Sequence, residues 1–487
     1  MQTVDIDMYT ECFILFDECE KLVQDVHYRD SIREPMNDFF RFQNKALISA
    51  TPIVPEKDSR FDGFMRVLIQ PDYVYRQKLK LITTNNVLET LQEVIEAKRG
   101  TVCIFCNSID SIDSFYRLIP ELSNACTFCS EDGQYKLWKG NRRKKSMMIT
   151  ELERYNFFTS RFYSAVDILC KNPPHVIFAR DLYGAAQSVI DPATEAIQII
   201  GRFRGGVNSV THIASIRPEL ECMSSSEIDH WIQGASTIFN GWKAQLARTT
   251  NIGERTLLQE AIGENSYLPY LDENGKPDSF LIANFYEKEQ VKRLYTSADL
   301  LHLAYEQTGY FVFSHEERLM PVSDNERMAI QHRLAKKKRA ELIVRKLEEM
   351  EKMSRATDKK IQKRYQRMLM NLITSTADRY IYDCFCRFGA EFVREADYNE
   401  NKLRTALNVS SEHTIKKSGQ MRTYIQRAFP VDAEISVQEA KSMLRQVYKK
   451  MGLNTGRGIT TKELEQYAEI ENSRNREARM IKILKHK

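Results

Sequence analysis

The chain has 487 residues, 42% of them hydrophobic, and a net charge of +5. This length predicts about three domains, and the composition is that of a globular protein. This composition excludes a disordered chain, and the modest net charge excludes a protein that is basic throughout. The N-terminal residues lack the basic and apolar regions of a signal peptide, and no uncharged apolar run reaches the ~20 residues of a membrane helix. Ten cysteines fit a reduced chain better than a disulfide scaffold. We therefore expect a cytoplasmic protein without a membrane segment.

Residues 1–55 predict a strand, a helix-rich connection and a second strand of a parallel α/β sheet. The apolar run 13–16 leads into Asp17-Glu18-Cys19-Glu20, and the run 45–48 leads into Ser49-Ala50-Thr51. Ligands bind at the carboxyl edge of a parallel sheet, so this acidic pair is a candidate metal or nucleotide contact. An acidic first turn of a helix is the structural alternative.

Residues 56–85 are interpreted as a connection between domains, and residues 86–222 as a complete α/β domain. Strands are expected at 101–106, 125–129, 156–160, 175–179 and 210–215, with helices at 87–97, 109–122, 141–154 and 193–202. Strands that alternate with helices predict a doubly wound parallel sheet.

The remainder is predicted to be mainly helical: an accessory region at 223–325, one long basic helix at 326–372, and a helical C-terminal module at 373–487. Residues 333–367 contain 14 basic and five acidic residues. Such a helix either follows nucleic-acid phosphates or is a solvated helix with i,i+4 ion pairs. The candidate phosphate contacts are Lys336, Lys337, Lys338 and Arg339.

The order Asp-Glu-x-Glu, Ser-Ala-Thr, Thr159-Ser160 with Asp167, and Gln198-x-x-Gly201-Arg202 resembles that of superfamily 2 DEAD/DEAH-box helicases, up to about residue 220. The resemblance implies a partial first RecA-like domain at 1–55 and a complete second one at 86–222. It also implies an ATP- and Mg²⁺-dependent motor on nucleic acid, with DNA favoured over RNA.

The resemblance also implies a role for each motif residue. Asp17 would hold Mg²⁺ through water, and Glu18 would polarise the attacking water. Ser49 and Thr51 would couple the nucleotide state to domain closure, while Thr159 and Ser160 would contact nucleic acid. The other expected ATP-site residues are Asp167, Gln198, Gly201 and an arginine finger, which is either Arg202 or Arg204.

Three features depart from this family. Glu20 stands where the commonest subgroups have His or Asp, and Gly205 occupies the slot of a second arginine. The phosphate-binding glycine loop is missing, because the first glycine is Gly63. We therefore expect the chain alone to be inactive, with the missing N-terminal half either truncated or supplied by another chain. The alternative is a non-catalytic nucleic-acid-binding or scaffolding remnant of a helicase.

Two weaker patterns remain. Residues 436–467 are faintly similar to the terminal helical module of phage and plasmid replication helicase-primases, which suggests DNA replication, although helix packing explains the pattern equally well. Cys103-x-x-Cys106 and Cys126-x-x-Cys129 match a four-cysteine zinc spacing. Both pairs lie in apolar predicted strands, where residues i and i+3 point to opposite faces. Buried core cysteines are therefore the better interpretation, and no zinc is expected.

Overall fold

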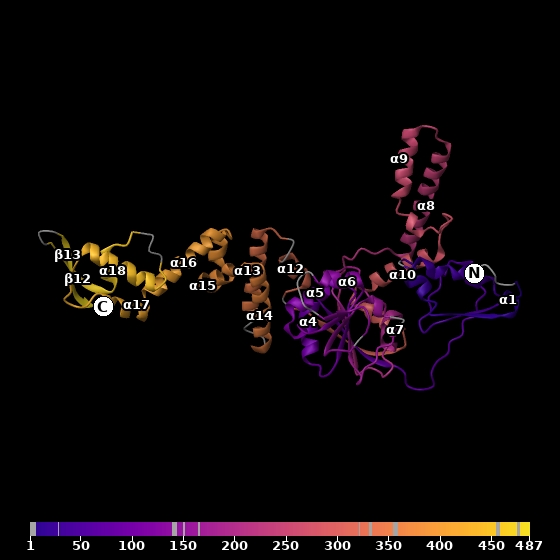
Figure 1. Ribbon diagram of the computed structural model, residues 1–487, viewed down its shortest axis with the longest axis horizontal. Coiled ribbons are helices and arrows are strands. Elements are labelled where there is room, and N and C mark those ends of the chain that lie inside the picture. The colour runs from indigo at the N-terminus through magenta and orange to yellow at the C-terminus, as the bar shows by residue number, and fades with distance from the viewer. Residues whose placement is uncertain are drawn as a thin grey trace. The chain divides into compact units, whose positions relative to one another are not determined.

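The computed structural model describes residues 6–27, 29–138, 144–149, 151–163, 166–320, 322–330, 334–353, 359–453, 458–474 and 478–487 (Figure 1). The chain divides into two compact units, Met1–Met328 and Ala329–Lys487. In the described ranges, no helix has the length and apolar character needed to span a membrane.

The first unit begins with a two-stranded parallel sheet. Strands β1 (Phe13–Asp17) and β2 (Asn44–Ile48) pair with Phe13 opposite Asn44. Alternate residues of a strand point to opposite faces. Ile14, Phe16 and Leu47 pack on a core that includes Phe39. The segment between the strands contains α2 (Lys21–Gln24) and α3 (Pro35–Arg41), and α1 (Ile6–Glu11) precedes β1.

The main sheet of this unit has eight parallel strands in the order β10-β3-β9-β8-β4-β7-β5-β6. The strands are β3 (Gln77–Thr84), β4 (Val102–Phe105), β5 (Cys126–Phe128), β6 (Lys144–Ser146), β7 (Tyr155–Phe158), β8 (His175–Arg180), β9 (Ser209–Ser215) and β10 (Phe311–Arg318). The expected α/β class with a parallel sheet is confirmed. The helix expected over 141–154 was wrong, because β6 lies within this range and pairs with β5.

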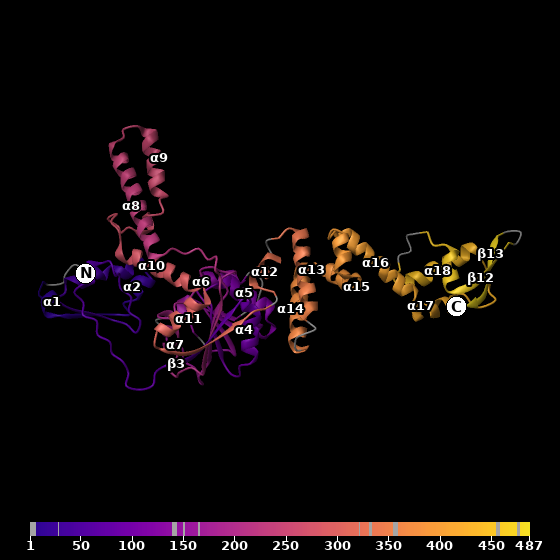
Figure 2. The same cartoon turned by 180° about the vertical axis from the view of Figure 1, so that it is seen from behind.

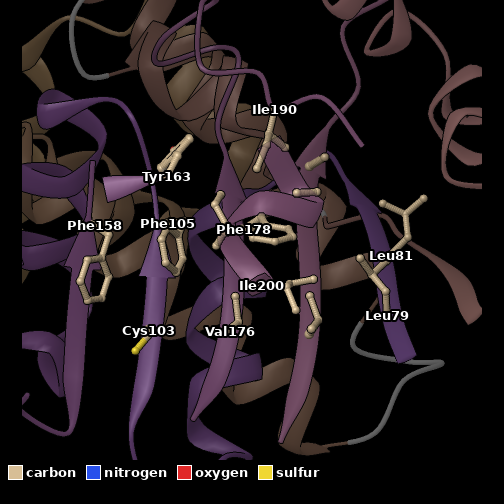
Figure 3. Packing of buried hydrophobic residues seen from close by; sticks show 14 of the residues in the cluster. Leu79, Leu81, Cys103, Phe105, Phe158, Tyr163, Val176, Phe178, Ile190 and Ile200 are labelled. Atoms are coloured by element: carbon tan, nitrogen blue, oxygen red, sulfur yellow. The ribbon is translucent and has the colours of Figure 1, made fainter. Parts of the chain in front are cut away.

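Helices cover both faces of this sheet (Figures 1 and 2). One face packs on α4 (Val87–Glu96), α5 (Ile109–Leu118) and α6 (Glu131–Trp138). The other packs on α7 (Glu195–Gly201), α10 (Ser279–Leu294) and α11 (Ala298–Gln307). Figure 3 shows Phe105, Phe158 and Phe178 on neighbouring strands of this second face, and the rings of Phe105 and Phe158 stack at 5.0 Å.

The sheet extends beyond the predicted domain at 86–222. Strand β3 lies in the predicted connection 56–85, and β10 lies in the predicted helical region 223–325. Both boundaries were therefore wrong. Strand β3 pairs with β9 and β10, so it is an interior strand of the sheet and not a linker. The rest of 223–325 is mainly helical, including the hairpin of α8 (Ser225–Arg248) and α9 (Ile252–Gly263) (Figure 1).

The second unit begins with four packed helices. These are α13 (Lys336–Met353), α14 (Lys359–Ser375), α15 (Arg379–Glu395) and α16 (Glu400–Lys416). The predicted single helix over 326–372 was wrong, because α13 and α14 are separate helices that pack together. Each has an apolar stripe whose residues are buried, such as Val344 in α13 and Ile373 in α14. An apolar stripe on a helix must pack against another element to be buried.

The C-terminal module combines helices with a small sheet. It contains α17 (Gly419–Ala428), β11 (Glu434–Ser436), α18 (Val437–Lys450), the 3-10 helix η7 (Thr461–Gln466), β12 (Ala468–Arg474) and β13 (Arg479–His486). The strands form an antiparallel sheet in the order β11-β13-β12. The prediction of a helical module missed this sheet. In β12 the alternation of apolar and charged residues covers only Ala468 to Glu471, and the rest of the strand is polar and exposed.

Candidate functional site

Gln198 joins the two sheets of the first unit. Its Nε2 atom, on α7, donates to Glu20 Oε1 at 2.7 Å and to Thr51 Oγ1 at 2.7 Å. Gln198 and Glu20 are 178 residues apart in the sequence. All three side chains are buried. The structure thus brings together residues of three motifs: the acidic one, the Ser-Ala-Thr one and the Gln-x-x-Gly-Arg one.

The ends of β1 and β2 present the acidic and hydroxyl residues to this junction. The Thr51 amide donates to Ser49 Oγ at 2.9 Å, which fixes the turn after β2. The Glu18 amide donates to Asp17 Oδ1 at 2.8 Å. Glu18 has a φ of +52°, a left-handed conformation that is uncommon for a residue with a side chain. A strained backbone conformation persists only where the surrounding structure holds it in place. Such conformations are concentrated at functional sites.

The two candidate arginines have different neighbours. Arg202, at the end of α7, is largely buried, and its Nη1 lies 3.7 Å from Glu18 Oε1. Arg204 is exposed and pairs with Asp167 at 3.0 Å. Arg202 therefore lies beside the acidic motif and is the better finger candidate. Asp167 accepts a hydrogen bond from Arg204 Nε.

The remaining motif residues lie at the ends of their elements. Thr159 is buried after β7, and its hydroxyl donates to the Phe128 carbonyl at 3.3 Å, whereas Ser160 is exposed. Gly201 ends α7, and a Cβ there would meet no atom within 4 Å. Packing therefore does not require glycine at this position.

The residues fit one side of an Mg²⁺-nucleotide site. Asp17 and Glu18 are two adjacent carboxylates that reach solvent, which suits a magnesium ion held through water. Glu20 Oε2 and Gln198 Oε1 are buried without a hydrogen-bond partner in the described structure, so they could accept from ordered water. No group of three or more metal-ligating side chains occurs among the described residues.

The four cysteines of the zinc-like spacing do not converge. Cys103 and Cys126 are buried in the core on one face of the main sheet, and Cys106 and Cys129 are buried in the core on the other. Because the sheet lies between Cys103 and Cys126 on one side and Cys106 and Cys129 on the other, the four cysteines cannot bind one zinc ion.

A second set of contacts also joins the β1–β2 segment to the rest of the first unit, and sequence patterns did not reveal it. Gln24 Nε2 donates to Thr194 Oγ1 at 3.0 Å and to Glu287 Oε1 at 3.3 Å. Asn284 on α10 donates to the Val23 carbonyl at 2.8 Å. Burial raises the pKa of Glu287 to about 8, and the carboxylates of Glu195 and Asp191 add to the rise. None of these residues belongs to a motif, so no sequence signal could have identified them.

Three of the four predicted phosphate contacts on α13 form ion pairs within the second unit. Lys336 pairs with Glu400, and Lys337 pairs with Asp397 at 2.6 Å. Arg339 donates twice to the buried Asp378, at 2.6 and 3.2 Å. Lys338 is exposed. By contrast α14 contains no acidic residue, and its Lys359, Lys363 and Arg367 are exposed at four-residue spacing.

Comparison of the chain with protein-family models and with curated proteins finds no match.

Proposed function

We propose that this chain is a helicase-like, nucleic-acid-dependent ATPase that contributes the acidic and arginine side of the ATP site, with DNA favoured over RNA as the track. The observation that carries the proposal is the Gln198 junction. One amide nitrogen holds Glu20 and Thr51 together, and Arg202 lies beside Glu18. A junction of this kind could couple the nucleotide state to the relative position of the two sheets.

The second part of the proposal concerns the fold. The main sheet would be the second RecA-like domain, and β1 and β2 would belong to the first. The parallel strand order, helices on both faces, and polar residues at the carboxyl ends of β1, β2 and β7 support this assignment.

Each residue would have a distinct task. Bound ATP with Mg²⁺ would supply the phosphoanhydride bond and a metal that neutralises phosphate charge. Asp17 would hold Mg²⁺ through water, and Glu18 would polarise the attacking water. Arg202 would stabilise the negative charge that develops on the transferred phosphoryl group, which is a large electrostatic contribution in such reactions.

The phosphates also need a cradle. The printed sequence contains no G-x-x-x-x-G-K-[ST] loop. We propose that another polypeptide segment supplies the phosphate-binding loop and packs on the β1–β2 sheet. On the face of this sheet away from its core, Phe13, Leu15 and Ile48 are 63%, 53% and 45% exposed. A two-stranded sheet is marginal by itself, and an apolar face of this kind needs a cover.

The test fuses the phosphate-loop half of a DEAD-box helicase upstream of Ile6 and measures phosphate release with and without single-stranded DNA. We expect background turnover from the chain alone and DNA-stimulated turnover from the fusion. Glu18→Gln and Arg202→Gln should abolish that turnover, while the matched control Arg204→Gln should retain it. A folded fusion that releases no phosphate would support the alternative, a non-catalytic remnant. Turnover by the chain alone that Glu18→Gln abolishes would refute the need for a second segment.

A further inference from the structure

Helix α18 in the C-terminal module has two chemically opposite sides. Ala440, Leu444, Val447 and Tyr448 are buried in the module's core. Lys441, Arg445 and Lys449 follow one another at four-residue spacing along one side of the helix. Lys441 is half-buried at the border of the core, and the other two lie further from it. Arg445 and Lys449 are exposed, as is the adjacent Lys450. The side chains Gln438, Ser442 and Gln446 lie around the basic stripe and are also exposed.

This basic stripe is not neutralised within the described structure. None of Lys441, Arg445, Lys449 and Lys450 forms an ion pair with a described residue, whereas three of the four basic residues at the start of α13 do. Glu439 is the only acidic residue of α18, and it lies in the first turn. The neighbouring helix α17 adds Arg422 and Arg427 and contains no acidic residue. An unpaired stripe of positive charge attracts a polyanion.

The chemistry of the face favours nucleic acid over an anionic membrane. A helix that binds a membrane surface must present a large apolar side to the lipid. The apolar side of α18 is already buried in the core, and no large hydrophobic residue of α18 is exposed. Glutamine, serine and arginine are instead the side chains that hydrogen-bond to base edges and phosphates.

The arrangement around α18 fits a duplex. A fold shared by many functions does not identify a ligand, so the inference rests on the charged face of α18. The major groove of B-form DNA admits an α-helix, whereas that of A-form RNA is too narrow.

We propose that the exposed face of α18 is a binding site for B-form duplex DNA. Lys441, Arg445 and Lys449 would contact phosphates, and Gln438, Ser442 and Gln446 would lie at the groove. This site is separate from the nucleotide junction and needs no ATP, so its test is independent of the proposed ATPase.

The test measures binding of the full-length chain to a duplex of about 20 base pairs, two helical turns, without nucleotide and over a range of salt. The variant combines Lys441→Gln, Arg445→Gln and Lys449→Gln. The control combines Arg66→Gln, Arg76→Gln and Lys78→Gln, which changes the net charge equally at exposed positions of the first unit. We expect the α18 variant to lower the slope of log affinity against log salt by about 3, and affinity at 0.1 M salt by roughly tenfold or more. The control should change neither.

Other results would overturn the proposal. Equal losses in the two variants would show an effect of net charge alone, and unchanged binding in the α18 variant would exclude the face. Tighter binding to vesicles of phosphatidylcholine and phosphatidylserine in equal parts than to the duplex would assign the stripe to a membrane. Equal affinity for an RNA duplex of the same sequence would exclude groove recognition. If the triple variant melts at a lower temperature than the parent, the single variant Arg445→Gln replaces it in the test. This variant should lower the slope of log affinity against log salt by about 1.

Discussion

At the scale of single residues, Gln198 shows how one side chain can link two parts of the site. Its amide nitrogen donates to a buried carboxylate and to a buried hydroxyl. The motif identified Gln198, Glu20 and Thr51 separately, through the helicase resemblance. It did not show that Glu20, at the position that departs from the family, is the direct partner of Gln198. Pairings across 178 residues cannot be deduced from spacing, because spacing reports only local geometry.

We expect Gln198→Ala to destabilise the first unit. The substitution removes the donor to Glu20 and leaves a buried carboxylate with no partner, which costs about 1–3 kcal/mol. Urea unfolding at neutral pH measures the change in the free energy of unfolding. The matched control is Arg204→Ala, which removes an exposed ion pair to Asp167 and should cost less than about 1 kcal/mol. Equal effects of the two substitutions would mean that Gln198 does not hold the junction.

At the scale of elements, the strands that follow a clear pattern were predictable and the others were not. The expected strands at 101–106, 125–129, 156–160, 175–179 and 210–215 match β4, β5, β7, β8 and β9. They are buried apolar runs between turn residues. Strand β10 ends in charged residues that form ion pairs at the sheet surface, including Lys80 with Glu316 at 2.5 Å and Arg318 with Glu93 at 2.8 Å. Its position at the edge of the sheet permits these charges, which hide the strand from a hydrophobic pattern.

Helix α12 (Asp324–Met328) docks on the main sheet through a buried ion triad. Arg327 Nη2 lies 3.2 Å from Asp181 Oδ2 and 3.1 Å from Asp324 Oδ1. Asp324 also accepts from the Val87 amide at 2.6 Å, at the start of α4. Burial raises the pKa of Asp324 to about 7, and the nearby Asp181 carboxylate adds to the rise. A folded-state pKa above the unfolded value means that this group's contribution to stability is lost as the pH rises toward 7.

We expect Arg327→Leu to lower the free energy of unfolding by about 3–5 kcal/mol at pH 8, because it leaves two buried carboxylates without their cation. The loss should be smaller at pH 5, where Asp324 is protonated in the folded state. Urea unfolding at the two pH values measures the difference. Arg318→Leu, which removes ion pairs of a less buried arginine, serves as the control and should show little dependence on pH over this range. The same loss for Arg327→Leu at both pH values would contradict the assigned protonation.

At the scale of the whole molecule, the sequence predicts the α/β part better than the rest. Alternating strands and helices identify a parallel sheet, and the motif order predicts which ends carry the site. The second unit lacked comparable signals, because the pairing of α13 with α14 and the sheet β11-β13-β12 depend on tertiary contacts. Charge alone does not separate the two interpretations of the basic segment, because it includes residues that pair with nearby acids, such as Arg339 with Asp378.

The exposed apolar face of the β1–β2 sheet has a consequence for the behaviour of the purified chain. Phe13, Leu15 and Ile48 lie on this face, and among the described strands β1 and β2 pair only with each other, so each has one unpaired edge. Exposed apolar edge strands promote association between chains. We expect the parent chain to self-associate as its concentration rises. A variant with Phe13→Thr, Leu15→Thr and Ile48→Thr should remain monomeric in analytical ultracentrifugation, since threonine keeps the strand preference and removes the apolar surface.

The control for this experiment is a second exposed apolar surface. Ile252 and Leu257 on α9 are 83% and 68% exposed, but they lie on a helix whose backbone groups are satisfied. Ile252→Thr with Leu257→Thr should leave self-association unchanged, because a helix offers no strand edge for pairing. If the α9 variant becomes monomeric and the β1–β2 variant does not, the β1–β2 face does not mediate self-association. The proposal that a phosphate-loop segment binds to this face would then lose its physical basis.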